Sequence, residues 1–195
     1  AASGDESSEA SDTESSEAES SEGEETSSGD VSELNIRIGM EPTSMNTLNS
    51  TYSNEFSLIN HMYDKLYMLD ENDTPQPSAA ETVDVSDDQL VYTFHLREDG
   101  MWSNGDPVTA GDFVYAWQRL ATPATAADYC YMIDMVKGYD LVNTGTPTGQ
   151  FETKVNADTG EEEQVEIMDH ADPTTLGVSA PDDKTFVVEL TYDCP

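Results

Sequence analysis

Large apolar residues recur with a period of two along residues 90–97. Every second position carries a large apolar side chain, namely Leu90, Tyr92, Phe94 and Leu96. A period of two is typical of a strand that buries one face. The pattern ends at residues 97–100, and Asn104 and Gly105 then tolerate the positive φ angles of a type I′ turn. The pattern therefore predicts a strand followed by a reversal of the chain.

A helix is predicted to begin at Thr109. Its hydroxyl can accept a backbone N–H of the first turn while the Asp112 carboxylate reaches back, which is a variant of the capping box. Val108 and Phe113 hold the two positions of a hydrophobic staple. Apolar residues then recur at i, i+3, i+4 and i+7 as Phe113, Ala116, Trp117 and Leu120. We expect this face of the helix to be core.

The other elements mix strands and helices without a regular βαβ repeat, which predicts an α+β fold (mixed α/β). In chain order, we expect a strand at residues 34–38, a helix through Phe56, Ile59, Tyr63 and Leu66, a turn-rich segment at 70–77, a helical segment at 127–139, a hairpin of residues 151–155 and 164–167, and strands at 176–180 and 185–192 around a turn at 181–183.

Composition separates the first 33 residues from the rest. They hold twelve acidic residues, eleven serines and no lysine, arginine or aromatic residue. Because so little apolar surface cannot offset the entropy of ordering, we expect residues 1–33 to be a disordered Ser/Glu-rich linker. Of the net charge of −34, −22 remains for residues 34–195. That balance disfavours nucleic acid, whose binding rests on Lys and Arg, and also disfavours adhesion to an anionic membrane.

Three nearly consecutive segments resemble the signature of the extracytoplasmic solute-binding proteins of peptide ABC transporters, family 5. They are residues 92–97, 102–110 and 112–119. Residues 41–46 are similar to the segment after that family's first strand, where Met45 stands in place of the usual Leu and Thr47 in place of Pro. The resemblance covers residues 34–195 and is weaker at 144–173.

The resemblance implies the N-terminal part of a two-lobed periplasmic-binding-protein-like fold with a small accessory domain. Residues 34–49 and 172–195 would then belong to the hinge lobe (domain I). Residues 50–171 would form the accessory domain (domain II), with an insertion hairpin near 146–171. The second lobe would be absent from this chain.

The resemblance also implies a function, namely the capture of oligopeptides for uptake by the extracellular component of an ABC transporter. Relatives pair the peptide backbone with their own, as an added strand that is indifferent to sequence, and close their lobes about a hinge. A membrane permease would be the partner. The implied protein is a monomer on the cell surface, lipid-anchored at its N-terminus, although neither a signal peptide nor a lipid-modified Cys is visible. Alternatives are dipeptides, nickel or haem as ligands, or a noncatalytic surface interaction module.

Four residues are predicted to contact the ligand because they match ligand-facing positions of the family. Thr51, Tyr52 and Ser53 match a loop after the first strand, and Tyr129 matches a tyrosine on a neighbouring helix. Two other interpretations stay open. Tyr52 and Ser53 could cap the helix that begins near Asn54, and Tyr129 also fits an apolar helix face. Trp102 and Trp117 are more typical of core.

The pattern of reactive side chains does not indicate an enzyme, a cofactor or a metal site. His61, His95 and His170 are scattered and form no His-x-x-x-His pair. A metal site at Asp169, His170 and Asp172 is conceivable but lacks a cysteine or a second histidine nearby. Cys130 and Cys194 could form one disulfide or remain two free thiols. With no apolar run near twenty residues, no transmembrane helix is expected.

Overall fold

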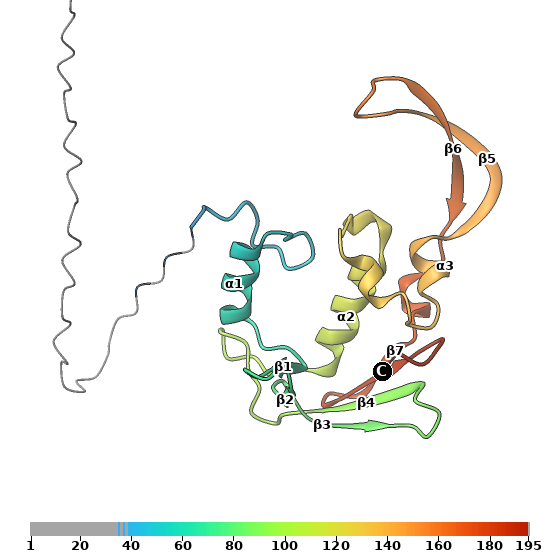
Figure 1. Cartoon of the computed structure of the whole chain (residues 1–195). Coiled ribbons are helices and arrows are strands. Elements are labelled where there is room, and N and C mark those ends of the chain that lie inside the picture. Colours follow the sequence, from blue (N-terminus) through green and yellow to red (C-terminus); the bar gives the residue numbers. More distant parts are fainter. Residues whose placement is uncertain (1–34, 36, 38, 195) are drawn as a thin grey trace, which may run out of the picture. The chain divides into compact units, whose positions relative to one another are not determined.

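The computed structural model describes residues 35, 37 and 39–194 (Figure 1). The predicted linker at residues 1–33 lies outside the described residues, as do three of the five positions of the predicted strand at 34–38. Of that strand, Asn35 and Arg37 are described and lie in no regular element. The described residues from 39 onward belong to one compact unit.

A four-stranded antiparallel sheet forms one side of the core of this unit (Figure 1). Its order is β3 (Ala80–Val85), β4 (Val91–Leu96), β8 (Thr185–Glu189) and β7 (Val178–Asp182). Phe94 lies opposite Phe186, and Tyr92 lies opposite Val188, so the alternating apolar residues share one face. The predicted strand at residues 90–97 is confirmed as β4. The later strand pair is confirmed as well, with β7 extending through Asp182 so that the turn falls at residues 183–184.

Helix α2 (Ala110–Ala121) covers the apolar face of the sheet. Its predicted cap is confirmed, because Asp112 Oδ2 accepts the Thr109 backbone N–H at 2.8 Å and the Thr109 hydroxyl at 3.0 Å. Phe113, Trp117 and Leu120 pack against the core as predicted. Ala116 does not, since it is exposed. The sequence pattern therefore located the helix and most of its buried face.

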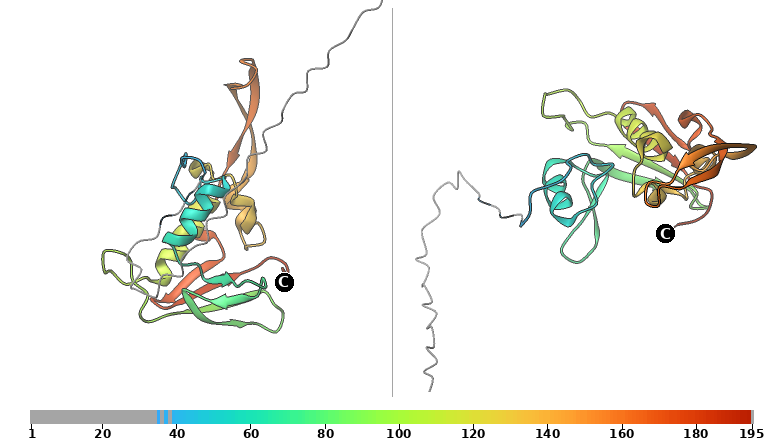
Figure 2. Two further views of the ribbon diagram at one scale, coloured as in Figure 1. Left: turned by 60° about the vertical axis from the view of Figure 1, so that its left-hand side comes forward. Right: turned by 90° about the horizontal axis from the view of Figure 1, so that it is seen from above.

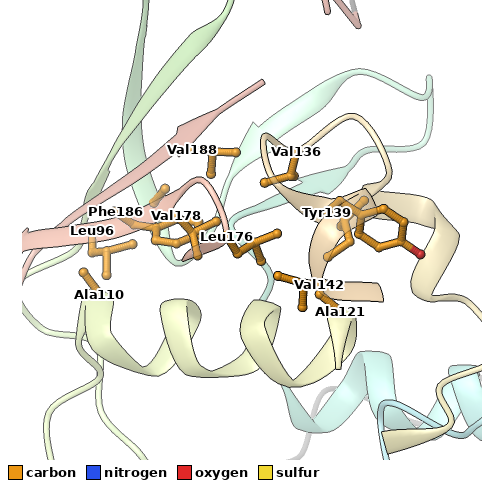
Figure 3. Close-up of a cluster of buried hydrophobic side chains, with 12 residues drawn as sticks. Leu96, Ala110, Ala121, Val136, Tyr139, Val142, Leu176, Val178, Phe186 and Val188 are labelled. Carbon is orange, nitrogen blue, oxygen red and sulfur yellow. The ribbon is translucent and has the colours of Figure 1, made fainter. Parts of the chain in front are cut away.

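Phe186 is the centre of the core and is 0 % exposed. Its ring centroid lies 5.5 Å from that of Trp117, 5.7 Å from Phe113 and 6.1 Å from Phe94. Figure 3 shows the buried aliphatic side chains that share this core with Phe186 between α2 and the sheet. They come from both halves of the chain and include Leu96, Ala110, Val136, Val142, Leu176, Val178 and Val188.

The remaining elements lie around this core. They are α1 (Ser53–Met62), the short pair β1 (Tyr67–Leu69) and β2 (Pro75–Pro77), α3 (Tyr139–Asn143), the ribbon β5 (Thr146–Val155) and β6 (Glu162–Asp169), and 3-10 turns at Pro123–Thr125, Cys130–Ile133 and Pro173–Thr175. The ribbon extends away from the sheet and is mostly exposed (Figure 2). A hairpin is thus present where one was predicted, with strands longer than expected, and its status as an insertion stays a prediction.

The prediction of a continuous helical segment at residues 127–139 is wrong. Only Cys130–Ile133 is helical there, as a 3-10 turn, and α3 begins at Tyr139 after Gly138 takes a φ of +81°. Val136 instead forms a β-bridge with Leu190, and the Lys137 N–H donates to the Glu189 carbonyl at 2.9 Å. Pairing with the end of β8 has therefore overridden the local helical spacing.

Two turns also differ from expectation. The segment at residues 70–77 is the tip and second strand of the β1–β2 hairpin rather than only a turn. At the reversal after β4, Gly105 has a φ of +90° and Asn104 does not have a positive φ. Because a type I′ turn needs positive φ at both central residues, that prediction is wrong. The Gly105 N–H closes the turn on the Trp102 carbonyl at 2.8 Å.

The sheet joins both sides of the predicted domain boundary at residues 171 and 172. Strands β3 and β4 come before it, and β7 and β8 come after it. All four belong to the same compact unit. Which lobe of a longer protein each range belongs to stays a prediction.

Candidate functional site

Thr51, Tyr52 and Ser53 lie at the start of α1. Tyr52 is the N-cap residue, with extended backbone angles, and Ser53 is the first helical residue. The capping interpretation is thus correct for Tyr52. Ser53 belongs to the helix, which begins one residue earlier than the expected Asn54. Tyr52 is 55 % exposed, Ser53 is exposed and Thr51 is half-buried, so Tyr52 and Ser53 present their side chains at the surface.

The Glu55 carboxylate organises the loop that carries these residues. It is 1 % exposed and accepts four backbone N–H groups. Oε1 accepts from Thr43 at 2.7 Å and Ser44 at 2.8 Å, while Oε2 accepts from Thr51 at 3.2 Å and Tyr52 at 3.5 Å. A buried carboxylate is tolerated where hydrogen-bond donors replace its water. One side chain therefore ties residues 43–44 to residues 51–52.

These donors also hold the Glu55 side chain in its charged form. The Ser44 N–H, the largest contribution, lowers the pKa of Glu55 below its usual value, and the other three donors add to it against the opposing effect of burial. Sequence reasoning did not identify Glu55. A carboxylate at the third position of a helix is a capping-box signal that points toward such a role.

A pH dependence follows from the lowered pKa of Glu55. Because the folded pKa is below the unfolded value, this group stabilises the fold above about pH 4.5 and loses that contribution as the pH falls through the folded pKa. We expect the wild type to lose more stability between pH 7 and pH 3 than Glu55→Gln, measured by chemical denaturation at each pH. Glu71→Gln, at an exposed turn position, is the matched control and should parallel the wild type. Parallel curves for Glu55→Gln would contradict this assignment.

Tyr129 lies beside Phe56 of α1, which comes 73 positions earlier in the sequence. Its ring centroid is 6.1 Å from that of Phe56 and 6.0 Å from that of Tyr131. The Tyr52 carbonyl accepts the Phe56 N–H at 3.1 Å, so Phe56 is linked to the predicted loop through its backbone and to Tyr129 through its ring. Tyr129 is 39 % exposed and precedes a 3-10 turn rather than sitting within a helix. The core interpretation of Tyr129 thus accounts for part of its surface only.

A second connection joins the same two segments. The Asn49 amide donates to the Ala126 carbonyl at 2.9 Å and to the Thr125 carbonyl at 3.3 Å. The structure therefore brings the loop of Thr51, Tyr52 and Ser53 together with the segment of Tyr129. Asn49 carried no motif in the sequence, and only the tertiary contact reveals it.

A cavity of about 520 Å³ lies elsewhere on the unit, and none of the four predicted residues lines it. Its walls come from the end of α1, the turn at residues 100–103 and the first half of α2. Trp102 lines it and is 42 % exposed, so the prediction that this tryptophan is core is wrong, whereas Trp117 is in the core. The Trp102 indole N–H donates to the Asp112 carboxylate at 3.4 Å.

The other candidate groups have structural partners. Among the described residues, no group of three or more His, Cys, Asp or Glu side chains is arranged to hold a metal ion. Asp172 accepts the backbone N–H and the hydroxyl of Thr174, and His170 Nδ1 lies 3.1 Å from the Val142 carbonyl oxygen. Within the same part of the chain, no helix is both long enough and apolar enough to cross a membrane.

Cys130 and Cys194 are free thiols in this structure. Cys130 is half-buried and lies against the buried Tyr139, whereas Cys194 is exposed. Burial raises the pKa of the Tyr139 hydroxyl, and the neighbouring Cys130 side chain raises the pKa further. The Cys130 thiol is therefore part of a packed contact with Tyr139.

Comparison with known proteins identifies the protein family of this chain. Residues 74–195 match the family model described as bacterial extracellular solute-binding proteins, family 5 Middle. The periplasmic oligopeptide-binding protein OppA of Haemophilus influenzae is 36 % identical over 160 residues, which are 82 % of this chain and 26 % of that protein. The dipeptide-binding protein DppE of Bacillus subtilis is 37 % identical over 105 residues, which are 54 % of this chain and 19 % of that protein.

A solved structure agrees with the sequence match. The crystal structure of Haemophilus influenzae OppA in complex with RPPGFSPFR superposes with a TM-score of 0.66 at 35 % identity, covering 81 % of this chain and 26 % of that one. The mixed helix-and-strand fold is thus that of a periplasmic binding protein. The chain belongs to family 5 of the bacterial extracellular solute-binding proteins. It spans about a quarter of the length of the oligopeptide-binding relative.

Proposed function

We propose that the full-length protein containing this chain captures oligopeptides outside the cytoplasm as the substrate-binding component of an ABC transporter. The observation that carries the proposal is the likeness, at a TM-score of 0.66, to an OppA solved with a bound nonapeptide. Family membership through residues 74–195 supports it independently. In this role the protein binds and releases its ligand without catalysis.

In the proposed mode, Thr51, Tyr52, Ser53 and Tyr129 contribute to the surface that meets the peptide. The exposure of Tyr52, Ser53 and Tyr129, and the ring contact of Tyr129 with Phe56 at the start of α1, support this. Peptide backbone groups would pair with protein backbone, and side chains would fall on adaptable, hydrated surface, which suits ligands of varied sequence. Residues 34–49 and 172–195 would belong to the hinge lobe and residues 50–171 to the accessory domain.

The proposal extends to the setting of the protein. A membrane permease would receive the peptide, and the protein would work as a monomer held at the cell surface by an N-terminal lipid anchor. The strongly acidic composition supports a site away from anionic lipid headgroups, with a linker between anchor and receptor. Dipeptides are the second candidate ligand, favoured by the match to the dipeptide-binding protein DppE.

The test of this function is a ligand-induced rise in melting temperature of the full-length protein. A ligand that binds only the folded state at 100 times its Kd stabilises it by about 2.7 kcal/mol. We expect mixed oligopeptides of three to nine residues to give such a rise, and free amino acids to give none. Dipeptides alone raising the melting temperature would favour the second candidate. A rise with nickel or haem, and none with peptides, would contradict both.

The contribution of Tyr129 is tested by replacing it with alanine. We expect about tenfold weaker affinity for RPPGFSPFR, because an aromatic contact adds about 0.5–1.5 kcal/mol beyond the apolar area that it buries. Tyr115→Ala is the matched control, since Tyr115 is 61 % exposed on α2 and has no predicted role. Titration calorimetry measures both. An unchanged Kd with a lowered melting temperature would instead make Tyr129 a purely structural residue.

A further inference from the structure

The side chain of Asn49 is fixed at both ends. Its Nδ2 donates to the Ala126 and Thr125 carbonyls at 2.9 and 3.3 Å, across 77 and 76 positions of sequence. Its Oδ1 accepts from Asn46 Nδ2 at 2.6 Å. The amide therefore connects two chain segments directly and is itself held in orientation by Asn46.

The loop that contains Asn49, residues 43–52, is held by its own hydrogen bonds and by those of Glu55. Ser50 is 1 % exposed, and its hydroxyl lies within hydrogen-bond distance of the Asn46 and Ser44 carbonyls, at 2.8 and 3.1 Å. Glu55 ties Ser44 to Thr51 through its two carboxylate oxygens. Residues 43–52 thus have few ways to deform separately, and we expect a shift at Asn49 to move Tyr52, three residues later.

The segment to which the Asn49 amide bonds, residues 125–126, contains a residue with a strained backbone. Ala126 has a φ of +50°, in the left-handed region that costs a non-glycine residue about 1–2 kcal/mol. Such a residue persists where its surroundings determine its conformation. Its N–H donates to the Pro123 carbonyl at 2.9 Å, and its own carbonyl accepts from Asn49. Tyr129 follows three residues later, so the direction of the chain at Ala126 sets where that ring lies.

We propose that Asn49 is a positioning residue that fixes the separation between the two halves of the candidate peptide-contact surface, the Thr51–Tyr52–Ser53 loop and the Tyr129 segment. The inference rests on the proposed function, because it concerns the same surface. Asn49 acts through Tyr52 and Tyr129, and its amide is occupied by protein groups. Its effect on affinity is therefore predicted to depend on the presence of Tyr129.

Asn49→Asp in the full-length protein tests the inference. The substitution keeps the size of the side chain, removes the Nδ2 donor and turns a carboxylate oxygen toward two carbonyls. We expect about tenfold weaker affinity for RPPGFSPFR, the consequence of losing roughly one net hydrogen bond to each carbonyl. Asn72→Asp makes the same chemical change in the exposed β1–β2 turn and should leave the affinity within about twofold of the wild type.

A double-mutant cycle separates positioning from general stability. If Asn49 acts by placing Tyr129, the tenfold loss should shrink to less than about threefold in the Tyr129→Ala background, because coupled residues are not additive. If the losses of affinity from Asn49→Asp and Tyr129→Ala simply add, the inference is overturned. It is also overturned if the wild type binds RPPGFSPFR and Asn49→Asp binds it as tightly as Asn72→Asp does.

A measurement on the ligand-free protein keeps this inference distinct from the proposed function. Amide exchange of residues 126–131 should be about tenfold faster in Asn49→Asp than in wild type or Asn72→Asp, since local opening is easier without the bridge. Unchanged exchange would overturn the inference whether or not peptide binds. A different result would count against the proposed function alone: the wild type binds no peptide, while exchange is still faster in Asn49→Asp. Asn49 would then only hold the two segments together.

Discussion

Replacing Phe186 with alanine is expected to lower the free energy of unfolding by about 3–5 kcal/mol. The ring is 0 % exposed and touches α2 through Phe113 and Trp117 and the neighbouring strand through Phe94. Removing it leaves a cavity between the helix and the sheet that several large aromatic rings cannot refill without leaving their own contacts. Denaturant unfolding of wild type and variant measures the loss.

Phe151→Ala is the matched control for this prediction. Phe151 is 59 % exposed on the β5–β6 ribbon, so the same truncation should change the free energy of unfolding by less than about 0.5 kcal/mol. Equal losses for the two variants would contradict a core centred on Phe186. A large loss at Phe151 alone would mean that the ribbon is covered in the intact protein.

Gly177→Ala is expected to destabilise the fold by about 1–3 kcal/mol, the usual cost of forcing extra volume into packed structure. A Cβ at this position would lie 2.8 Å from the Lys137 Cβ, 2.9 Å from the Glu189 carbonyl oxygen and 3.1 Å from the Lys137 carbonyl oxygen. Two of these atoms are backbone, and both carbonyls accept short hydrogen bonds at this junction. Relief therefore requires the three segments to separate. Denaturant unfolding again gives the comparison.

Gly111→Ala makes the same change with the opposite expected sign. Gly111 lies in the first turn of α2, where a Cβ would meet the Thr109 hydroxyl at an ordinary 3.5 Å. Because alanine favours the helix over glycine, we expect a gain of up to about 1 kcal/mol. If both substitutions were neutral, close backbone approach at Gly177 would not be what holds β7 and β8 to residue 137.

Strand β4 and helix α2 were predictable because each carries its own local signals. Large apolar residues at every second position specify β4, and α2 has a capping box at Thr109 followed by a regular apolar face. Strand β3 escaped prediction because it lies at the edge of the sheet and buries only Ala80 fully. The β1–β2 hairpin was also not predicted, because β2 contains two prolines. Proline is unusual in strands but is tolerated in edge strands.

Non-local contacts account for the remaining differences. Residues 127–139 have helical spacing in the sequence, yet Val136 and Lys137 pair with the end of β8, more than fifty residues later. Glu55 and Asn49 were missed in the sequence for the same reason. Both bond to backbone groups elsewhere in the chain, and no side-chain motif indicates such contacts. Of the four residues suggested by resemblance, three are exposed and Thr51 is half-buried, and the side chains that hold them in place were visible only in the fold.

The measurement that tests the central claim most directly is titration calorimetry of the full-length protein with two peptides of identical composition and different order, RPPGFSPFR and a scrambled form. Recognition through the peptide backbone predicts that both bind, with Kd values within about tenfold of each other. Binding of neither peptide, under conditions where the protein is folded, would contradict the assignment of this chain to an oligopeptide receptor.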